Sequence, residues 1–180
     1  MKNLKYILLL FLTILFINCK NDDNNLDVAF DFTLANLAGT YGVNTYGADL
    51  TNTANTQGTD VVISTATIVG DIFQVVLTLN ANGTYTATGQ YSITTTVRPV
   101  SGPPTVTPEI LLVDNEGTFT INDSADNRSI TFVATKGEFL NGEYLVNFLS
   151  EEGITIIQDK TETDGSVTTQ TVTTISLLKD

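Results

Sequence analysis

The chain of 180 residues has no histidine, no tryptophan and a single cysteine. Most nucleophile–base pairs of enzymes use histidine or cysteine, and zinc sites usually do so as well. An internal disulfide needs two cysteines, so none can form within the chain. These absences argue against the commoner catalytic and metal sites. We predict a protein that is not an enzyme and that needs no cofactor.

Basic residues are also scarce. Eight Lys and Arg residues stand against twenty Asp and Glu residues, which gives a net charge of −12 at pH 7. Binding to nucleic acid depends on clustered Lys and Arg side chains that neutralise phosphates. We exclude nucleic acid as a partner because the basic residues beyond residue 20 are few and scattered: Arg98, Arg128, Lys136, Lys160 and Lys179.

The N-terminus has the features of a secretion signal. Lys2 and Lys5 precede an apolar run over residues 6–17, which is shorter than the about 20 apolar residues that cross a bilayer core. The only cysteine, Cys19, stands at the end of this run and resembles the lipidated cysteine of bacterial lipoproteins. The resemblance implies a helical signal peptide over residues 1–18, a lipid on Cys19 and an anchor in the outer membrane. An ordinary cleaved signal and an uncleaved anchor are the alternatives.

The segment that follows the cysteine is polar and acidic. We interpret residues 19–36 as the lipidated cysteine and a solvated tether. The acidic run over residues 20–25 also resembles the signal that directs some outer-membrane lipoproteins to the cell surface. The resemblance implies that the protein is exposed on the cell surface rather than facing the periplasm.

The remaining residues, 37–180, predict one all-β domain. Thr, Val, Ile, Phe and Tyr are abundant there, and all of them favour strands. Residues 84–96 alternate apolar and polar side chains, as in an antiparallel sheet with one buried face, and Asn82-Gly83 is a strong hairpin signal. Residues 47–60 and the proline-rich residues 98–108 are predicted loops. The predicted strands are 37–46, 61–69, 72–80 (after a turn or bulge at 70–71), 84–96, 109–113 and 116–122 (or one strand bent at 114–115), 129–135, 139–149, 154–161 and 167–178.

Three pieces of this region together resemble the lipocalin-like domains of bacterial lipoproteins. They are the opening Leu37-Ala-Gly-Thr-Tyr41, the hairpin over residues 77–91 and the closing hairpins over residues 143–178. The resemblance implies an antiparallel meander barrel of about eight or nine strands. An immunoglobulin-like β-sandwich is the alternative fold that the same strand spacing allows.

A barrel of this size either fills itself with side chains or holds one small ligand. We interpret its large inward side chains first as packed core and second as the lining of a ligand site. The number of tyrosines favours a ligand, because a buried hydroxyl needs a hydrogen-bond partner. The residues predicted to face inward are Tyr41, Tyr85, Tyr91, Phe119, Phe132, Tyr144, Val146 and Phe148.

Several polar segments offer other chemistry, each with a simpler interpretation as a turn. Residues 122–127 and 159–164 carry oxygen ligands of the kind that Ca²⁺ prefers, but without the spacing of a calcium loop, so we predict no metal. Ser124, in Asp-Ser-Ala, resembles the acceptor of O-linked glycans in some of the bacteria that use acidic lipoprotein export signals. Two carboxyl groups can cleave glycosides when a cleft separates them correctly, and the candidate pairs are Glu138 with Glu143 and Glu151 with Glu152.

The sequence leaves two functions open. The first is a non-catalytic lipoprotein, anchored in a membrane through Cys19, whose lipocalin-like barrel binds a small apolar or amphipathic ligand. The second is a structural or interaction module of the cell envelope with a filled barrel, no small-molecule ligand and a protein partner that the sequence does not identify. A large enclosed cavity lined by the tyrosines favours the first function. A filled interior with apolar side chains exposed outside favours the second.

Overall fold

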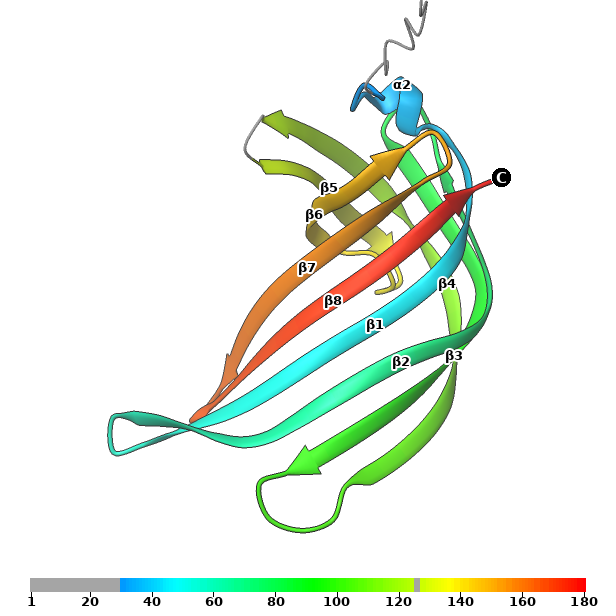
Figure 1. Ribbon diagram of the computed structural model, residues 1–180. Helices are drawn as coiled ribbons and strands as arrows, with labels where there is room; N and C mark the ends of the chain where they lie inside the picture. Colours follow the sequence, from blue (N-terminus) through cyan, green and yellow to red (C-terminus); the bar gives the residue numbers. More distant parts are fainter. Residues whose placement is uncertain (1–29, 125–126) are drawn as a thin grey trace, which may run out of the picture.

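The computed structural model describes residues 30–124 and 127–180. They form a closed antiparallel barrel of eight strands, in which strands that follow one another in sequence pair and β8 pairs with β1 (Figure 1). The predicted all-β meander barrel is therefore confirmed, and the alternative β-sandwich is wrong. The predicted signal peptide, Cys19 and most of the predicted tether lie outside the described residues. The elements are α2 (Leu34–Leu37), β1 (Gly39–Thr56), β2 (Thr59–Leu79), β3 (Thr84–Pro99), β4 (Thr105–Ser124), β5 (Asn127–Lys136), β6 (Gly142–Ser150), β7 (Gly153–Asp164) and β8 (Val167–Lys179).

The core lies inside the barrel because apolar side chains alternate along the strands. In β3, Tyr85, Ala87, Tyr91 and Ile93 are buried, whereas the intervening polar residues face outward. Burying one large apolar side chain contributes about 1.5–3 kcal/mol. The alternation predicted for residues 84–96 therefore also supplies much of the energy that holds β3 in the wall.

The short helix α2 lies at one end of the barrel, beside the C-terminus (Figure 1). Thr33 caps it by accepting a hydrogen bond from the backbone N–H of Asn36 at 3.2 Å. Phe32 and Leu37 are 2% and 0% exposed and belong to the core. The packed domain therefore begins before Leu37, its predicted first residue. No helix in the described part of the chain is long and apolar enough to span a membrane.

β1 and β2 continue through residues 47–60, which the sequence predicted as a loop. Their hairpin turns only at Gln57-Gly58, where both residues have positive φ, as a tight two-residue turn requires. Asn52 donates to Ser64 Oγ at 2.9 Å and accepts from Thr169 Oγ1 at 2.7 Å, which joins three strands. The prediction was wrong because these small polar residues show no apolar alternation, and the backbone ladder does not require it.

β2 is one strand where two were predicted. The register with β3 shifts between Asp71 and Gln74, and Ile72 adopts a positive φ of 49. The predicted turn or bulge at residues 70–71 is therefore a bulge within a continuous strand. A bulge adds a residue on one strand and increases the local twist without ending the pairing.

β4 begins inside the predicted proline-rich loop. The connection from β3 spans only residues 100–104, and Pro108 lies within β4 opposite Thr94. β5 pairs with β4 only from Glu116 onwards, so residues 105–115 have no partner strand other than β3 among the described residues. A proline fits a strand where no ladder bond needs its N–H, as on such an edge.

Residues 137–141, here called the β5–β6 loop, separate β5 from β6 and contain the predicted start of a strand at Phe139. Gly137 has φ 76, and a Cβ there would lie 2.6 Å from the carbonyl oxygen of Asp114. Gly142 has φ 97, and a Cβ there would lie 2.7 Å from Gln158 Nε2. Both ends of the loop therefore need glycine. The loop keeps β5 and β6 short, and the β1–β2 and β3–β4 hairpins extend past them (Figure 1).

Candidate functional site

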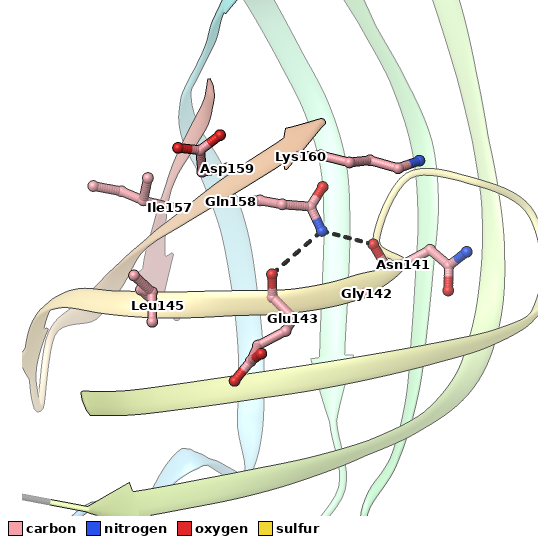
Figure 2. A pocket seen from close by; sticks show the side chains of 8 residues that line it. All are labelled: Asn141, Gly142, Glu143, Leu145, Ile157, Gln158, Asp159 and Lys160. Atoms are coloured by element: carbon pink, nitrogen blue, oxygen red, sulfur yellow. Dashed lines mark hydrogen bonds between the residues drawn. The ribbon is translucent and has the colours of Figure 1, made fainter. Parts of the chain in front are cut away.

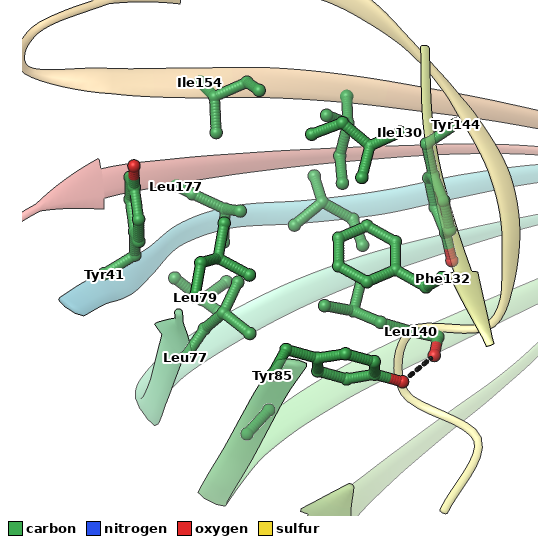
Figure 3. Close-up of a cluster of buried hydrophobic side chains, with 14 of the residues drawn as sticks. Tyr41, Leu77, Leu79, Tyr85, Ile130, Phe132, Leu140, Tyr144, Ile154 and Leu177 are labelled. Carbon is green, nitrogen blue, oxygen red and sulfur yellow. Dashed lines mark hydrogen bonds between the residues drawn. The ribbon is translucent and has the colours of Figure 1, made fainter. Parts of the chain in front are cut away.

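Several of the aromatic side chains predicted to line a ligand cavity pack against one another, and Figure 3 shows Tyr85, Phe132 and Tyr144 close together in the interior. The ring of Phe132 contacts Tyr85 and Tyr144 edge-on, with centroid distances of 5.1 and 5.8 Å. Phe119 lies 6.0 Å from Phe132, and all four residues are at most 3% exposed. Edge-to-face contacts at these distances are the arrangement that aromatic rings prefer in a packed interior.

A second aromatic cluster surrounds Tyr91, which is also buried. Its ring lies 5.3 Å from Tyr46, 6.0 Å from Phe73 and 5.6 Å from Phe139 of the β5–β6 loop. Burial raises the pKa of Tyr91 well above its ordinary value, and the neighbouring Tyr46 raises it further. The cluster therefore stays neutral, and the β5–β6 loop supplies one of its rings.

Two buried tyrosine hydroxyls have hydrogen-bond partners within the chain. Tyr41 Oη donates to the carbonyl oxygen of Leu37, and Tyr85 Oη donates to that of Leu140, both at 2.7 Å. Burial raises the pKa of Tyr144 to about 12. Backbone carbonyls thus satisfy the hydroxyls of Tyr41 and Tyr85, two of the tyrosines that the sequence offered as a sign of a ligand.

Phe148 faces solvent, so the prediction that it faces inward is wrong. It is 57% exposed, whereas Leu149 packs against the core. The register between β6 and β7 shifts between Val146 and Phe148, because Asn147 is an extra residue there. A bulge of this kind reverses the alternation beyond it. Val146 precedes the bulge and packs against the core, as predicted.

Asn115 holds the β5–β6 loop against β4 and is not among the residues predicted from the sequence. Its side chain is 2% exposed. Asn115 Nδ2 donates to the carbonyl oxygen of Lys136, and Oδ1 accepts from the N–H of Leu140 at 3.1 Å. The signal that could have found it is its position two residues after Val113, which places a polar side chain on the inward face of the strand.

An open pocket of about 460 Å³ lies where β7 continues beyond the first residues of β6 (Figure 2). Gln158 Nε2 donates to the carbonyl oxygens of Asn141 and Glu143, at 2.9 and 3.3 Å, and so joins the start of β6 to β7. Asp159 accepts hydrogen bonds from Gln170 at 3.1 Å. The polar groups of this pocket are thus already bonded within the protein, and its wall lacks the mainly apolar lining of small-molecule sites.

The unpaired residues 105–113 of β4, here called the β4 edge, direct backbone groups away from the barrel wall. The N–H of Phe119 donates to Gly83, on the β3 side, and the β3–β4 register has no shift. Because backbone direction alternates along a strand, odd-numbered residues of β4 point at β3 and even-numbered residues point away. Consistent with this, Thr135 of β5 donates to the carbonyl oxygen of Glu116. Pro108 therefore lacks its N–H on the open side.

The even-numbered residues of the β4 edge also carry exposed apolar side chains. Val106, Ile110 and Leu112 are 60%, 69% and 81% exposed. Their side chains share the outer face, because every second residue of a strand points to the same side. A strand edge with free backbone groups and exposed apolar side chains is a template for pairing with another strand.

The described residues of the two candidate calcium segments lie at the ends of strands β4, β5 and β7 and form exposed ion pairs. Asp123 pairs with Arg128 at 2.8 Å, and Glu162 pairs with Lys160 at 2.6 Å. In residues 30–124 and 127–180, no three acidic side chains converge into a group that could hold a metal ion. These pairs are exposed, and exposed ion pairs contribute at most about 1 kcal/mol.

The remaining polar candidates are also at the surface. Glu143 accepts a hydrogen bond from Ser129 Oγ at 2.7 Å, and residues 151–152 form the exposed turn between β6 and β7. Ser124 is exposed, and its Oγ donates to the carbonyl oxygen of Asn127 at 3.1 Å. Glycosylation of Ser124 stays a prediction, and part of its acceptor sequence lies outside the described residues.

No family model, curated protein or solved structure matches the chain. Three places in the molecule compete for the function: the aromatic interior, the polar pocket beside Gln158 and the β4 edge. Of these three, the β4 edge alone combines several exposed apolar side chains with backbone groups that lack partners among the described residues.

Proposed function

We propose that the protein is a non-catalytic, lipid-anchored interaction module of the cell envelope, with a filled barrel. The observation that carries the proposal is the packing of the tyrosines. The rings of Tyr85, Tyr91 and Tyr144 contact other aromatic rings, and the hydroxyls of Tyr41 and Tyr85 are bonded to backbone carbonyls. Apolar side chains remain exposed outside, at the β4 edge, where a partner can cover them.

The competing function is the binding of a small apolar or amphipathic ligand inside the barrel. A ligand there must displace rings that already contact one another, at the cost of their packing energy. The test is a titration of the purified mature protein with fluorescent fatty acids, together with its native mass after incubation with cell extract. We expect no displacement signal and a bare polypeptide mass. A stoichiometric bound lipid would replace our proposal with the ligand-binding function.

The lipid anchor is a separate part of the proposal and has its own test. Cys19 is the one residue that the lipoprotein processing route can modify, and one acyl chain alone holds a protein only weakly to a membrane, whereas two or more hold it stably. Cells expressing the chain are labelled with a radioactive lipid precursor, with Cys19→Ala as the control. We expect label in the parent protein only. Equal label in both proteins would remove the anchor from the proposal.

The proposed location is the outer face of the outer membrane. Protease added to intact cells is expected to degrade the protein, with a periplasmic protein as the control that survives. Digestion only after lysis would place the module in the periplasm instead. The intact mass of the same protein tests Ser124, since a glycan there adds mass that Ser124→Ala removes.

A further inference from the structure

We propose that the β4 edge receives an extended segment of another envelope protein, with apolar side chains on one face and a basic side chain on the other, as an added β-strand. The inference rests on the proposed interaction function and assigns it a surface and a partner chemistry. Strand addition is a recurring mode of peptide recognition, in which backbone hydrogen bonds give affinity and alternate side chains give specificity.

The backbone groups required for strand addition are present. Val106, Ile110 and Leu112 direct both N–H and C=O to the open side, and Pro108 directs its C=O there, as the alternation of β4 requires. Pro108 costs the added strand one hydrogen bond and costs the β3–β4 ladder none. The β5–β6 loop, held by Asn115, stops β5 before it can cover this edge.

The two faces of the β4 edge demand different side chains. Neighbouring residues of paired strands point to the same face and contact one another. On the outer face, Val106, Ile110 and Leu112 offer exposed apolar neighbours. On the inner face, Glu109 is exposed and pairs with no Lys or Arg in the described part of the chain. The complementary strand therefore carries apolar residues on the outer face and a basic residue opposite Glu109 on the inner face.

The charge of the barrel favours the same partner. The described residues include sixteen acidic and five basic side chains. Four of the five basic side chains already have partners: Arg128 with Asp123, Lys136 with Asp114, Lys160 with Glu162, and Lys179 with the carbonyl oxygen of Asn36.

Arg98, the fifth, lies at the end of β3 nearest the β3–β4 turn, close in sequence to the start of the β4 edge. Glu109 is the one acidic residue of the β4 edge itself, and the barrel as a whole carries the negative excess. A second copy of the chain would bring the same excess of negative charge, which opposes self-pairing. A basic segment is attracted by the same negative charge, so its binding is favoured, and this attraction weakens as the salt concentration rises.

The direct test is amide hydrogen exchange of the mature protein with a synthetic peptide that alternates lysine and valine over the length of the edge. We expect the peptide to protect the amides of Val106, Ile110 and Leu112. The amides of Thr107 and Glu109 point at β3 and are expected to be protected already in the free protein. Binding is expected to weaken with added salt. A peptide that alternates glutamate and valine, and one with the lysines and valines in separate blocks, are the controls.

The variant Ile110→Pro removes an N–H from the open side and leaves the β3–β4 ladder intact, as Pro108 does in the parent chain. We expect unchanged circular dichroism and a loss of affinity of about tenfold or more. Ile110→Thr keeps the N–H and is expected to bind with an intermediate affinity. If Ile110→Pro fails to fold, Val106→Pro takes its place. The hydrogen exchange of the parent protein with the peptide still shows whether the even-numbered amides become protected.

Three results would overturn the inference. They are equal binding of the glutamate peptide, an absence of new protection at the even-numbered amides, and a dimer in solution that Ile110→Pro dissociates. The last result would assign the edge to a second copy. None of them alters lipid labelling at Cys19 or the test for bound fatty acid, so failure here is distinguishable from failure of the proposed function.

Discussion

Tyr85 donates its hydroxyl to the backbone carbonyl of Leu140, 2.7 Å away in the β5–β6 loop. Asn115 binds the same loop through the backbone of Lys136 and Leu140. Two buried polar side chains, one from β3 and one from β4, therefore fix the loop that ends β5. The position of this loop in turn decides how much of β4 remains unpaired.

Replacing Tyr85 by phenylalanine removes one hydrogen bond and leaves the Leu140 carbonyl without its partner. We expect a loss of about 1–2 kcal/mol, which lowers the thermal midpoint of a chain of this size by about 2–8 °C. Tyr41→Phe is the matched control, since it removes a bond of equal length to Leu37. Both variants are expected to lose similar stability, but only Tyr85→Phe should speed hydrogen exchange in residues 137–141. Equal exchange in the two variants would refute the role of Tyr85 in the loop.

Asn115 is expected to be far more sensitive to substitution than other asparagines of the barrel. Asn115→Leu keeps the volume but leaves the buried N–H of Leu140 and the part-buried C=O of Lys136 unsatisfied, which costs about 2–4 kcal/mol. Urea unfolding at neutral pH measures the loss. Asn52→Leu removes part-buried hydrogen bonds to other side chains and is expected to cost about 1 kcal/mol. Equal costs would show that Asn115 is not the main support of the loop.

Alkaline pH is expected to destabilise the barrel through its buried tyrosines. Burial raises the pKa of Tyr144 from 10.0 to about 12. The unfolded chain therefore loses the Tyr144 proton first, so this stability is complete below pH 10 and is lost as pH rises towards 12. The slope for one tyrosine is at most about 1.4 kcal/mol per pH unit. Denaturant unfolding across this range, with tyrosinate absorbance as a second probe, should show a shallower decline in Tyr144→Phe than in the parent. Identical declines of stability in the two proteins would contradict the raised pKa of Tyr144.

The bulge at Asn147 makes opposite predictions for two neighbouring residues. Phe148→Ala removes an exposed ring and should change stability by less than about 0.5 kcal/mol. Leu149→Ala removes a side chain packed against the core and should cost about 1–3 kcal/mol. Thermal or urea unfolding of the pair distinguishes the bulged register from the unbroken alternation, which reverses the order.

Much of the barrel follows from alternation, but its exceptions do not. Tyr85, Tyr91 and Tyr144 face inward because apolar and polar residues alternate around them. Phe148 departs from this alternation because of a bulge. A bulge depends on how two strands pair, and the sequence of one strand does not show it.

The candidate surface could be predicted even less well. Pro108 suggested a loop, since the sequence does not reveal that β4 lacks a second neighbour at that point. Asn115 gave only one signal, its inward position two residues after Val113, because its partners are backbone groups more than twenty residues away in sequence. The exposure of Ile110 and Leu112 depends on the same missing neighbour.

Lys179 Nζ donates a hydrogen bond to the carbonyl oxygen of Asn36 at 2.9 Å. Both ends of the described chain therefore lie at the α2 end of the barrel. The β3–β4 hairpin and the β4 edge lie towards the opposite end (Figure 1). The molecule thus has a proximal pole, from which any N-terminal attachment must leave, and a distal pole. With a lipid on Cys19, the membrane holds the proximal pole, and the edge points outward to where a second protein can approach without crossing the lipid surface.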